Sequence, residues 1–299
     1  MENNFDVIII GGSYAGLSAG MALGRSLRNV LIIDSGKPCN RQTPHSHNFI
    51  TQDGKRPKEI SELAKEQVTK YETVSFFNGT AIKTSKSDNG FEVETGCGEK
   101  FTAKKIILAT GVKDIMPDIE GFSECWGISV IHCPYCHGYE VKGKKTGILS
   151  NGDLAFEFSK IVFNLSKDLT LFTNGESTLN REQIEKFSQN KIVITEKEIQ
   201  KIVHHNGQIE KIIFKDGSES EMEVLYAKIP FEQNMNTEDL NLELTEHGFI
   251  KIDQFHKTST EGVFACGDNT TMMRSVANAV AQGNFAGAMV NKELSQEEF

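Results

Sequence analysis

Two cysteines separated by two residues, with a histidine directly after the second, are the residues whose types and spacing most suggest chemistry. They are Cys133, Cys136 and His137, within the segment HCPYCHGYE at 132–140. The pattern suits three functions: covalent attachment of a c-type haem, half of a zinc site, or a redox-active disulfide.

The surrounding sequence favours the disulfide. A closed zinc site needs four ligands, commonly from two close pairs of Cys or His. The chain has no second CxxC, and His45 and His47 lie far away in a segment that is not rich in cysteine. The N-terminus MENNFDVIIIGGSYAG shows no signal peptide, so we expect a cytoplasmic protein that is not exported for haem attachment. In that reducing compartment a close cysteine pair is more often catalytic or metal-binding than structural.

Composition narrows the class of protein and partner. A length of 299 residues predicts two domains. The formal net charge of −9, without a basic block, argues against nucleic acid as the main partner. No apolar run approaches the roughly 20 residues that cross a bilayer, so we expect no membrane span. The four other cysteines are each predicted to be small, buried core residues: Cys39, Cys97, Cys125 and Cys266.

The first 34 residues have the layout of a dinucleotide-binding βαβ unit. An apolar β-branched run at 5–10 predicts a buried strand, a glycine-rich turn follows at 11–16, then a helix, and the strand at 29–33 ends in Asp34. The turn brings the helix N-terminus towards a pyrophosphate, and the acid is placed to accept a hydrogen bond from a ribose hydroxyl. Ser13 replaces the middle glycine of the G-x-G-x-x-G pattern.

A second unit of this kind begins near residue 145. A strand at 145–150, a turn, a helix at 154–165 and a strand at 169–172 repeat the order, and short strands and turns are expected from there to about 230. A strand at 262–268 and a small-residue helix from 275 close the chain. The sequence therefore predicts an α/β fold with two similar nucleotide-binding units.

The arrangement resembles the low-molecular-weight thioredoxin reductase family of FAD-dependent flavoproteins. The resemblance covers essentially the whole chain and rests on GGSYAG at 11–16, ATG at 109–111, CPYCHG at 133–138, NGDLAFE at 151–157 and EGVFACGD at 261–268. It implies two Rossmann-like, three-layer domains, the second inserted into the first. An FAD-binding domain would comprise 1–113 and 246–299, and an NAD(P)H-binding-like domain with the CxxC would comprise 114–245.

The resemblance also assigns the residues that hold FAD. The glycines of the first turn would hold the pyrophosphate, Asp34 the adenosine ribose and Asp268 the ribityl or pyrophosphate part, while the last helix begins at the flavin pyrimidine. The implied cofactor-binding residues are Gly11, Gly12, Ser13, Gly16, Asp34, Asn48, Thr110, Gly111, Asp268, Arg274, Ser275 and Val276.

For catalysis the resemblance implies that Cys136 faces the flavin and that Cys133 attacks the substrate disulfide. A CxxC at a helix start lowers a thiol pKa, in agreement with these roles. His137 stands where bacterial reductases have an aspartate, and a histidine there is suited to moving a proton or stabilising a thiolate. His45 and His47 would lie near the flavin as further acid/base candidates, or serve as polar loop residues.

The second nucleotide motif departs from the family pattern. Ser150 replaces its first glycine, and Thr173-Asn174-Gly175 stands where the family has a basic cluster for the 2′-phosphate of NADPH. NADPH is the first expectation for the electron donor. The alternatives are NADH and a donor that is not a nucleotide, such as ferredoxin.

We expect a disulfide reductase with thioredoxin or another disulfide as substrate, and a homodimer as the family resemblance suggests. CPYCHGYE and LTLFTNG also resemble the branch of gliotoxin-type dithiol oxidases, which pass electrons to oxygen. That activity is the first alternative, and a flavin-bound redox sensor is the second.

Overall fold

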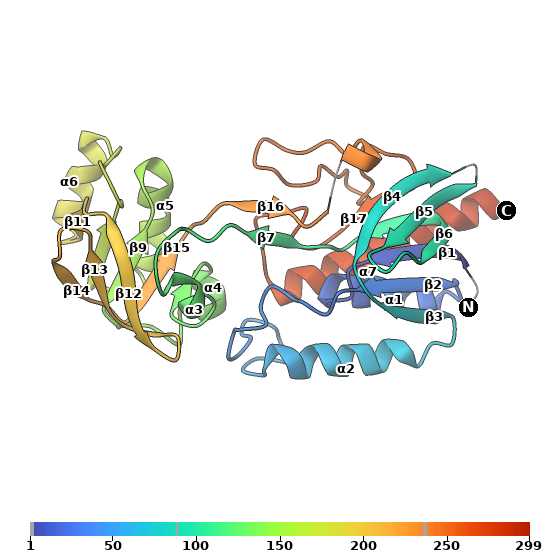
Figure 1. Cartoon of the computed structure of the whole chain (residues 1–299), viewed down its shortest axis with the longest axis horizontal. Coiled ribbons are helices and arrows are strands. Elements are labelled where there is room, and N and C mark those ends of the chain that lie inside the picture. Colours follow the sequence, from blue (N-terminus) through green and yellow to red (C-terminus); the bar gives the residue numbers. More distant parts are fainter. Residues whose placement is uncertain (1–2, 88, 236–237) are drawn as a thin grey trace. The chain divides into compact units, whose positions relative to one another are not determined.

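The computed structural model describes residues 3–87, 89–235 and 238–299. It divides into two compact units (Figure 1). The first comprises Met1–Arg41, Phe49–Lys113 and Phe231–Phe299, and the second comprises Gln42–Asn48 and Asp114–Pro230. Among the residues so described, no helix combines the length and apolar character that crossing a membrane requires.

The first unit is built on a sheet in the order β3-β2-β1-β6-β5-β4, with β17 also paired to β6. β1, β2, β3, β6 and β17 pair in parallel, whereas β4 and β5 form an antiparallel extension of β6. The strands are β1 (Asn4–Ile10), β2 (Val30–Asp34), β3 (Val74–Asn78), β4 (Ala81–Ser87), β5 (Gly90–Thr95), β6 (Lys100–Leu108) and β17 (Val263–Ala265). The helices are α1 (Tyr14–Arg25), α2 (Pro57–Thr69), α7 (Val276–Glu298) and the 3-10 turn η1 (Glu238–Leu240).

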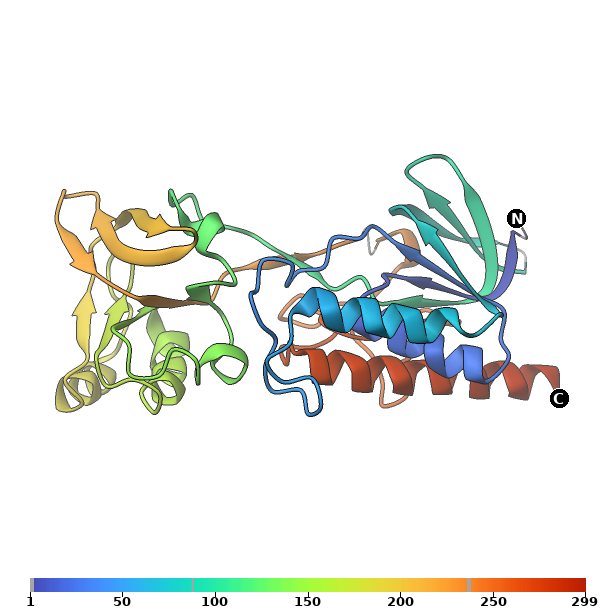
Figure 2. The same cartoon turned by 90° about the horizontal axis from the view of Figure 1, so that it is seen from below.

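The strand β1 is apolar on both faces because both faces are covered. Val7 and Ile9 belong to a core shared with α1, α2 and α7, whereas Ile8 and Ile10 belong to a core shared with β5 and β6. Figure 2 shows the three helices together on one side of the parallel strands. A continuous Val/Ile run is the expected sequence for such a doubly covered strand.

The second unit has three layers. Its parallel sheet, in the order β11-β10-β9-β15-β8, is covered by α5 and α6 on one face and by an antiparallel sheet, β12-β13-β14, on the other (Figure 2). The strands are β8 (Val130–Ile131), β9 (Thr146–Leu149), β10 (Leu169–Phe172), β11 (Val193–Thr195), β12 (Ile199–His205), β13 (Gln208–Phe214), β14 (Glu219–Glu221) and β15 (Val224–Ala227). The helices are α3 (Phe122–Cys125), α4 (Pro134–His137), α5 (Gly152–Val162) and α6 (Arg181–Gln189). The expectation of two Rossmann-like, three-layer domains is confirmed.

The strands β7 (Val112–Asp114) and β16 (Phe231–Gln233) form a two-stranded sheet where the chain passes between the units. The inserted domain was expected to span 114–245, whereas the second compact unit ends at Pro230 and includes Gln42–Asn48. Phe231 packs on Phe249 with ring centroids 4.7 Å apart, and the side chain of Gln233 donates to the carbonyl of Gly248 at 2.8 Å. These contacts attach the segment after Pro230 to the first unit.

The helix α6 lies where the sequence analysis expected only short strands and turns, so that expectation is wrong. Its start is a capping box: Asn180 accepts from the backbone N–H of Gln183, and the Gln183 side chain accepts from the backbone N–H of Asn180. Phe187 anchors the helix in the core beneath the sheet. The Asn-x-x-Gln spacing is a known helix-start signal, and it was present in the sequence.

Candidate flavin and disulfide sites

The CxxC lies at the start of the short helix α4, directly after β8. Cys133 and Cys136 form a disulfide with their Cα atoms 5.3 Å apart. Cys133 is the N-cap residue, and Pro134 occupies the first helical position, where its missing N–H costs nothing. The backbone N–H of Cys136 donates to Sγ of Cys133 at 3.2 Å. A donor held on one sulfur favours its charged form once the disulfide opens.

His137 ends the same helix and is largely shielded from water. Burial, with a smaller contribution from the nearby His47, lowers its pKa from 6.5 to about 4. The imidazole is therefore neutral at neutral pH while the disulfide is closed. A neutral imidazole next to the thiols is able to accept a proton that a thiol releases.

The segment 42–48 belongs to the second compact unit and brings a second histidine to this helix. Nδ1 of His47 lies 3.5 Å from Oε1 of Glu140, and the rings of His45 and His47 are 6.4 Å apart. The structure thus groups His47, His137 and Glu140. Glu140 was missed by the sequence analysis, although it lies within HCPYCHGYE, because nothing in the local pattern indicated that the distant His47 would meet it.

The first glycine-rich turn is packed so closely against neighbouring backbone that only glycine fits at two of its positions. A Cβ on Gly11 would overlap the carbonyl oxygen of Ala109, and one on Gly16 would overlap that of Gly11. Ser13 is the N-cap of α1, yet its side chain makes no capping hydrogen bond. The first N–H groups of α1 therefore keep the arrangement that binds a pyrophosphate.

Asp34 stands at the carboxyl end of β2, beside this turn. Its Oδ1 accepts the backbone N–H of Gly12 at 3.0 Å, and its side chain lies where a Cβ on Gly12 would be. One carboxylate oxygen is thus fixed on the turn, which orients the group towards a ribose placed at the same strand end.

The other residues assigned to FAD gather at the same edge of the sheet, with one exception. Ile10 pairs with Ile33 and with Leu108, so the segments after β1, β2 and β6 leave the sheet together. Thr110 accepts from the side chain of Asn269 at 3.4 Å. The exception is Asn48, which belongs to the second compact unit.

The start of α7 completes this edge. Nε of Arg274 lies 3.5 Å from Oδ2 of Asp268, and the Ser275 side chain accepts the backbone N–H of Asn278 as N-cap of the helix that begins at Val276. Gly111 has φ +61° and no atom within 4 Å of a would-be Cβ, which leaves space beside it. The turn, the acid and the two helix starts fit an FAD-type dinucleotide.

The remaining cysteines divide into two kinds. Cys125 and Cys266 are buried as predicted, and burial raises the pKa of these thiols to about 11 and about 12, which keeps them protonated and inert. Cys39 and Cys97 are exposed, so the prediction that they are core residues is wrong. Both lie in turns after a strand, outside the buried faces.

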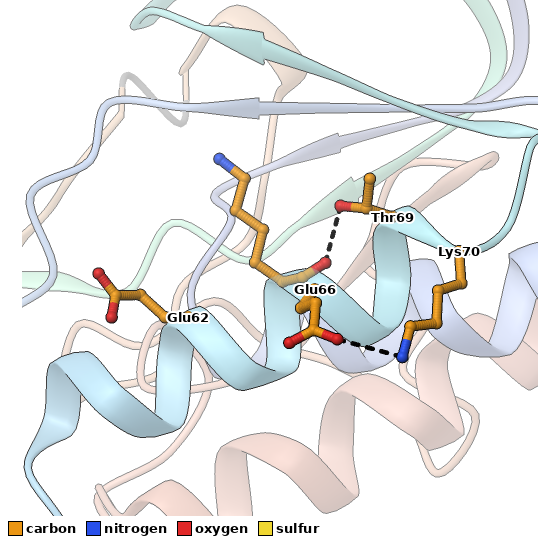
Figure 3. A pocket seen from close by; sticks show the side chains of 5 residues that line it. Glu62, Glu66, Thr69 and Lys70 are labelled. Atoms are coloured by element: carbon orange, nitrogen blue, oxygen red, sulfur yellow. Dashed lines mark hydrogen bonds and ion pairs between the residues drawn. The ribbon is translucent and has the colours of Figure 1, made fainter.

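Two other features lie outside this chemistry. A hollow beside α2 is lined by Glu62, Lys65, Glu66, Thr69 and Lys70, all from one exposed helix face, where Lys70 pairs with Glu66 at 3.2 Å (Figure 3). In the described part of the chain no group of three or more His, Cys, Asp or Glu side chains is arranged to hold a metal ion.

Comparisons with known proteins agree with this geometry. The sequence profile of the pyridine nucleotide-disulphide oxidoreductase family matches residues 5–283. The thioredoxin reductase tcpT of Claviceps purpurea (strain 20.1) is 36% identical over 305 aligned residues, 98% of this chain and 95% of the relative. The resemblance to thioredoxin reductases is thereby confirmed.

Solved structures give the same result. A putative thioredoxin reductase TrxB from Bacillus anthracis superposes with a TM-score of 0.94 at 32% identity, covering 99% of this chain and all of the other. An oxidoreductase from Agrobacterium tumefaciens superposes with a TM-score of 0.91 at 36% identity, covering 99% of each chain. Membership of the matched family implies FAD, a nicotinamide cofactor and a disulfide substrate. From its sequence, its fold and these relatives, the chain belongs to the pyridine nucleotide-disulphide oxidoreductase family.

Proposed function

We propose that the protein is an FAD-dependent disulfide oxidoreductase whose Cys133–Cys136 pair exchanges electrons with thioredoxin, a thioredoxin-like protein or a small disulfide. The observation that carries the proposal is the backbone N–H of Cys136 directed at Sγ of Cys133. It supports Cys133 as the thiolate that attacks the substrate and Cys136 as the thiol that resolves the mixed disulfide. When bound, FAD supplies two-electron redox chemistry to this pair.

The residues around the pair are proposed to manage its protons. His137 is neutral in the disulfide form and accepts a proton from an incoming or newly formed thiol. His47 and Glu140, whose Nδ1 and Oε1 atoms lie 3.5 Å apart, are proposed to take the proton on from His137. In the first unit, Gly11, Gly12, Ser13, Gly16 and Asp34 are proposed to hold the FAD pyrophosphate and ribose.

The remaining FAD contacts are proposed on the family resemblance and on the shared sheet edge. They are Thr110, Gly111, Asp268, Arg274, Ser275 and Val276, together with Asn48 from the second unit. A homodimer and a cytoplasmic location are also proposed from the resemblance, and light scattering on the purified protein tests the first.

The exchange is tested without assuming an electron donor. The protein is reduced chemically under anaerobic conditions, freed of reductant and mixed with oxidised thioredoxin or with a small aromatic disulfide. The proposal expects one disulfide reduced for each Cys133–Cys136 pair oxidised, and no reaction in Cys133→Ser. Equal reaction in Cys133→Ser would contradict it.

A second function uses the same residues in the opposite direction. The ring of His137 is unprotonated at neutral pH, because burial lowers its pKa to about 4, and it is the proposed proton acceptor for an incoming dithiol. The dithiol then becomes a disulfide, and its two electrons and two protons pass on to oxygen as hydrogen peroxide. Oxygen uptake that requires both a small dithiol and Cys133 would identify this activity.

A further inference from the structure

The two strand–turn–helix units differ in how their helices begin. In the first, the N-cap Ser13 leaves its side chain out of the cap. In the second, the N-cap is Asn151, and its Oδ1 accepts the backbone N–H of Gly152 at 2.8 Å. The N–H that a pyrophosphate would use at the start of α5 is therefore already bonded to a side chain of the chain itself.

Asn151 also fastens a second segment across this turn. Its Oδ1 accepts from the backbone N–H of Thr178 at 2.9 Å and from the Thr178 hydroxyl at 3.2 Å. Its Nδ2 donates to the carbonyl of Glu176 at 2.9 Å. Three hydrogen bonds of one side chain thus hold residues 176–178 against the start of α5, and a fourth binds the backbone N–H of Gly152. We call this arrangement the Asn151–Thr178 clamp.

The clamp occupies the position that the glycine of the motif normally keeps open. Gly152 has φ +60°, and a Cβ on it would lie 2.7 Å from the hydroxyl oxygen of Thr178. In dinucleotide-binding turns the absent side chain at this glycine lets the pyrophosphate approach the backbone. Here the Thr178 hydroxyl takes that space.

The strand end beside the turn offers nothing to a ribose or a 2′-phosphate. In the first unit Asp34 stands there, whereas after β10 the buried Thr173 donates its hydroxyl to the carbonyl of Gly175 at 2.6 Å. Oδ1 of Asn174 accepts the N–H of Ile199 at 2.7 Å. The nearby charge is negative, because Glu196 accepts the N–H of Ser177 at 3.0 Å. Among the described residues, no lysine or arginine side chain hydrogen-bonds to Thr173, Asn174 or Glu196, so no basic group is held at this strand end for a phosphate.

We infer that the Asn151–Thr178 clamp closes the second nucleotide turn to the pyrophosphate of NADH and NADPH alike. The residues present therefore do not fit the nicotinamide cofactor that the family implies. A donor then reaches the protein by thiol exchange: two thiols of a dithiol become a disulfide while Cys133–Cys136 becomes two thiols. That second statement rests on the proposed function, whereas the closure of the turn does not.

Isothermal titration calorimetry of the FAD-loaded protein tests the closure. FAD then fills the first turn, so any nucleotide binding that is measured arises at the second turn. The probes are ADP-ribose, NADH and NADPH. The inference expects no saturable binding with a dissociation constant of about 1 mM or tighter for any of them. Saturable binding of any probe in that range would overturn it.

The variant Asn151→Gly with Thr178→Ala removes the clamp and tests its role. Binding of ADP-ribose or NADH should then strengthen by at least about tenfold, into the measurable range. Ser177→Ala, in the same segment but without a contact to Asn151, should bind no better than the wild type. If the double variant keeps its flavin and its reduction by dithiothreitol yet gains no binding, the clamp is not what closes the turn and the inference fails. If dithiothreitol does not reduce the wild-type flavin, the proposed function fails while the calorimetry still decides the closure.

Discussion

The backbone N–H of Cys136 donates to Sγ of Cys133 at 3.2 Å. This contact stabilises a thiolate at Cys133 after reduction, so Cys133 is predicted to attack the substrate. Cys136→Ser should therefore trap a mixed disulfide between Cys133 and the substrate, which mass spectrometry detects. Cys133→Ser should trap none and should lower exchange by at least about a hundredfold.

Cys97→Ser is the matched control for this pair of variants, because Cys97 is an exposed thiol of the first compact unit, whereas the disulfide belongs to the second. It should exchange at the wild-type rate. If Cys133→Ser instead forms the stable adduct, the roles of the two cysteines are reversed.

Asp34→Asn should weaken FAD binding while leaving the turn folded. An asparagine oxygen still accepts the N–H of Gly12, but it presents no charge to a ribose hydroxyl. Hydrogen bonds to charged groups contribute about 1.5–3 kcal/mol, so the dissociation constant should rise by roughly 10- to 100-fold. Quenching of flavin fluorescence on titration of the apoprotein measures it, with Glu66→Gln on the exposed face of α2 as control. An unchanged constant would remove Asp34 from the site.

Gly283→Ala should loosen α7 from α1. A Cβ at this position would overlap the carbonyl oxygen of Ala15, and backbone atoms cannot rotate out of the way as a side chain would. We expect the free energy of unfolding to fall by about 1–3 kcal/mol, with earlier release of FAD on heating. Flavin fluorescence during thermal unfolding reports this. Asn284→Ala, at the exposed neighbouring position, should leave the unfolding temperature unchanged. Equal unfolding temperatures in both variants would show that the close contact between Gly283 and Ala15 does not stabilise the protein.

His137 predicts how stability depends on pH. Its folded-state pKa of about 4 lies below the ordinary 6.5, so between these values the unfolded chain binds more protons than the folded protein. The contribution of the neutral imidazole is present above pH 6.5 and is lost as the pH falls towards 4, by at most about 3 kcal/mol. NMR titration of the histidine rings should find a midpoint below 5 for the signal that disappears in His137→Asn. A midpoint near 6.5 would show that the ring is hydrated. His247→Asn, on the exposed surface, should not change the midpoint of His137.

The parallel strands and the first turn were predictable because their signals are local. The run FDVIII, the glycine turn and Asp34 lie within about 30 residues of one another, so a local pattern identifies them. The parallel pairing of β1 with β2 then places the turn and Asp34 at one edge of the sheet. The helix α6 was missed because only two of its residues, Ile184 and Phe187, are apolar, so the segment has no hydrophobic run, and its clearest signal is the capping box.

The grouping of His47 with His137 and Glu140 depends on contacts between segments about 90 residues apart, which no local pattern encodes. The Asn151–Thr178 clamp is similar. Ser150 and Thr173-Asn174-Gly175 marked the second motif as unusual, but only the folded loop shows that Thr178 fills the space at Gly152. For the same reason the exposure of Cys39 and Cys97 could not be read from residue type.

The most direct test of the account is an anaerobic absorbance titration of the FAD-loaded protein with dithiothreitol, in the wild type and in Cys133→Ser. We expect that dithiothreitol, a two-electron donor, bleaches the flavin absorbance of the wild type and does not bleach that of Cys133→Ser. Equal bleaching of both proteins, or of neither, would contradict the claim that Cys133 and Cys136 connect the flavin to thiols.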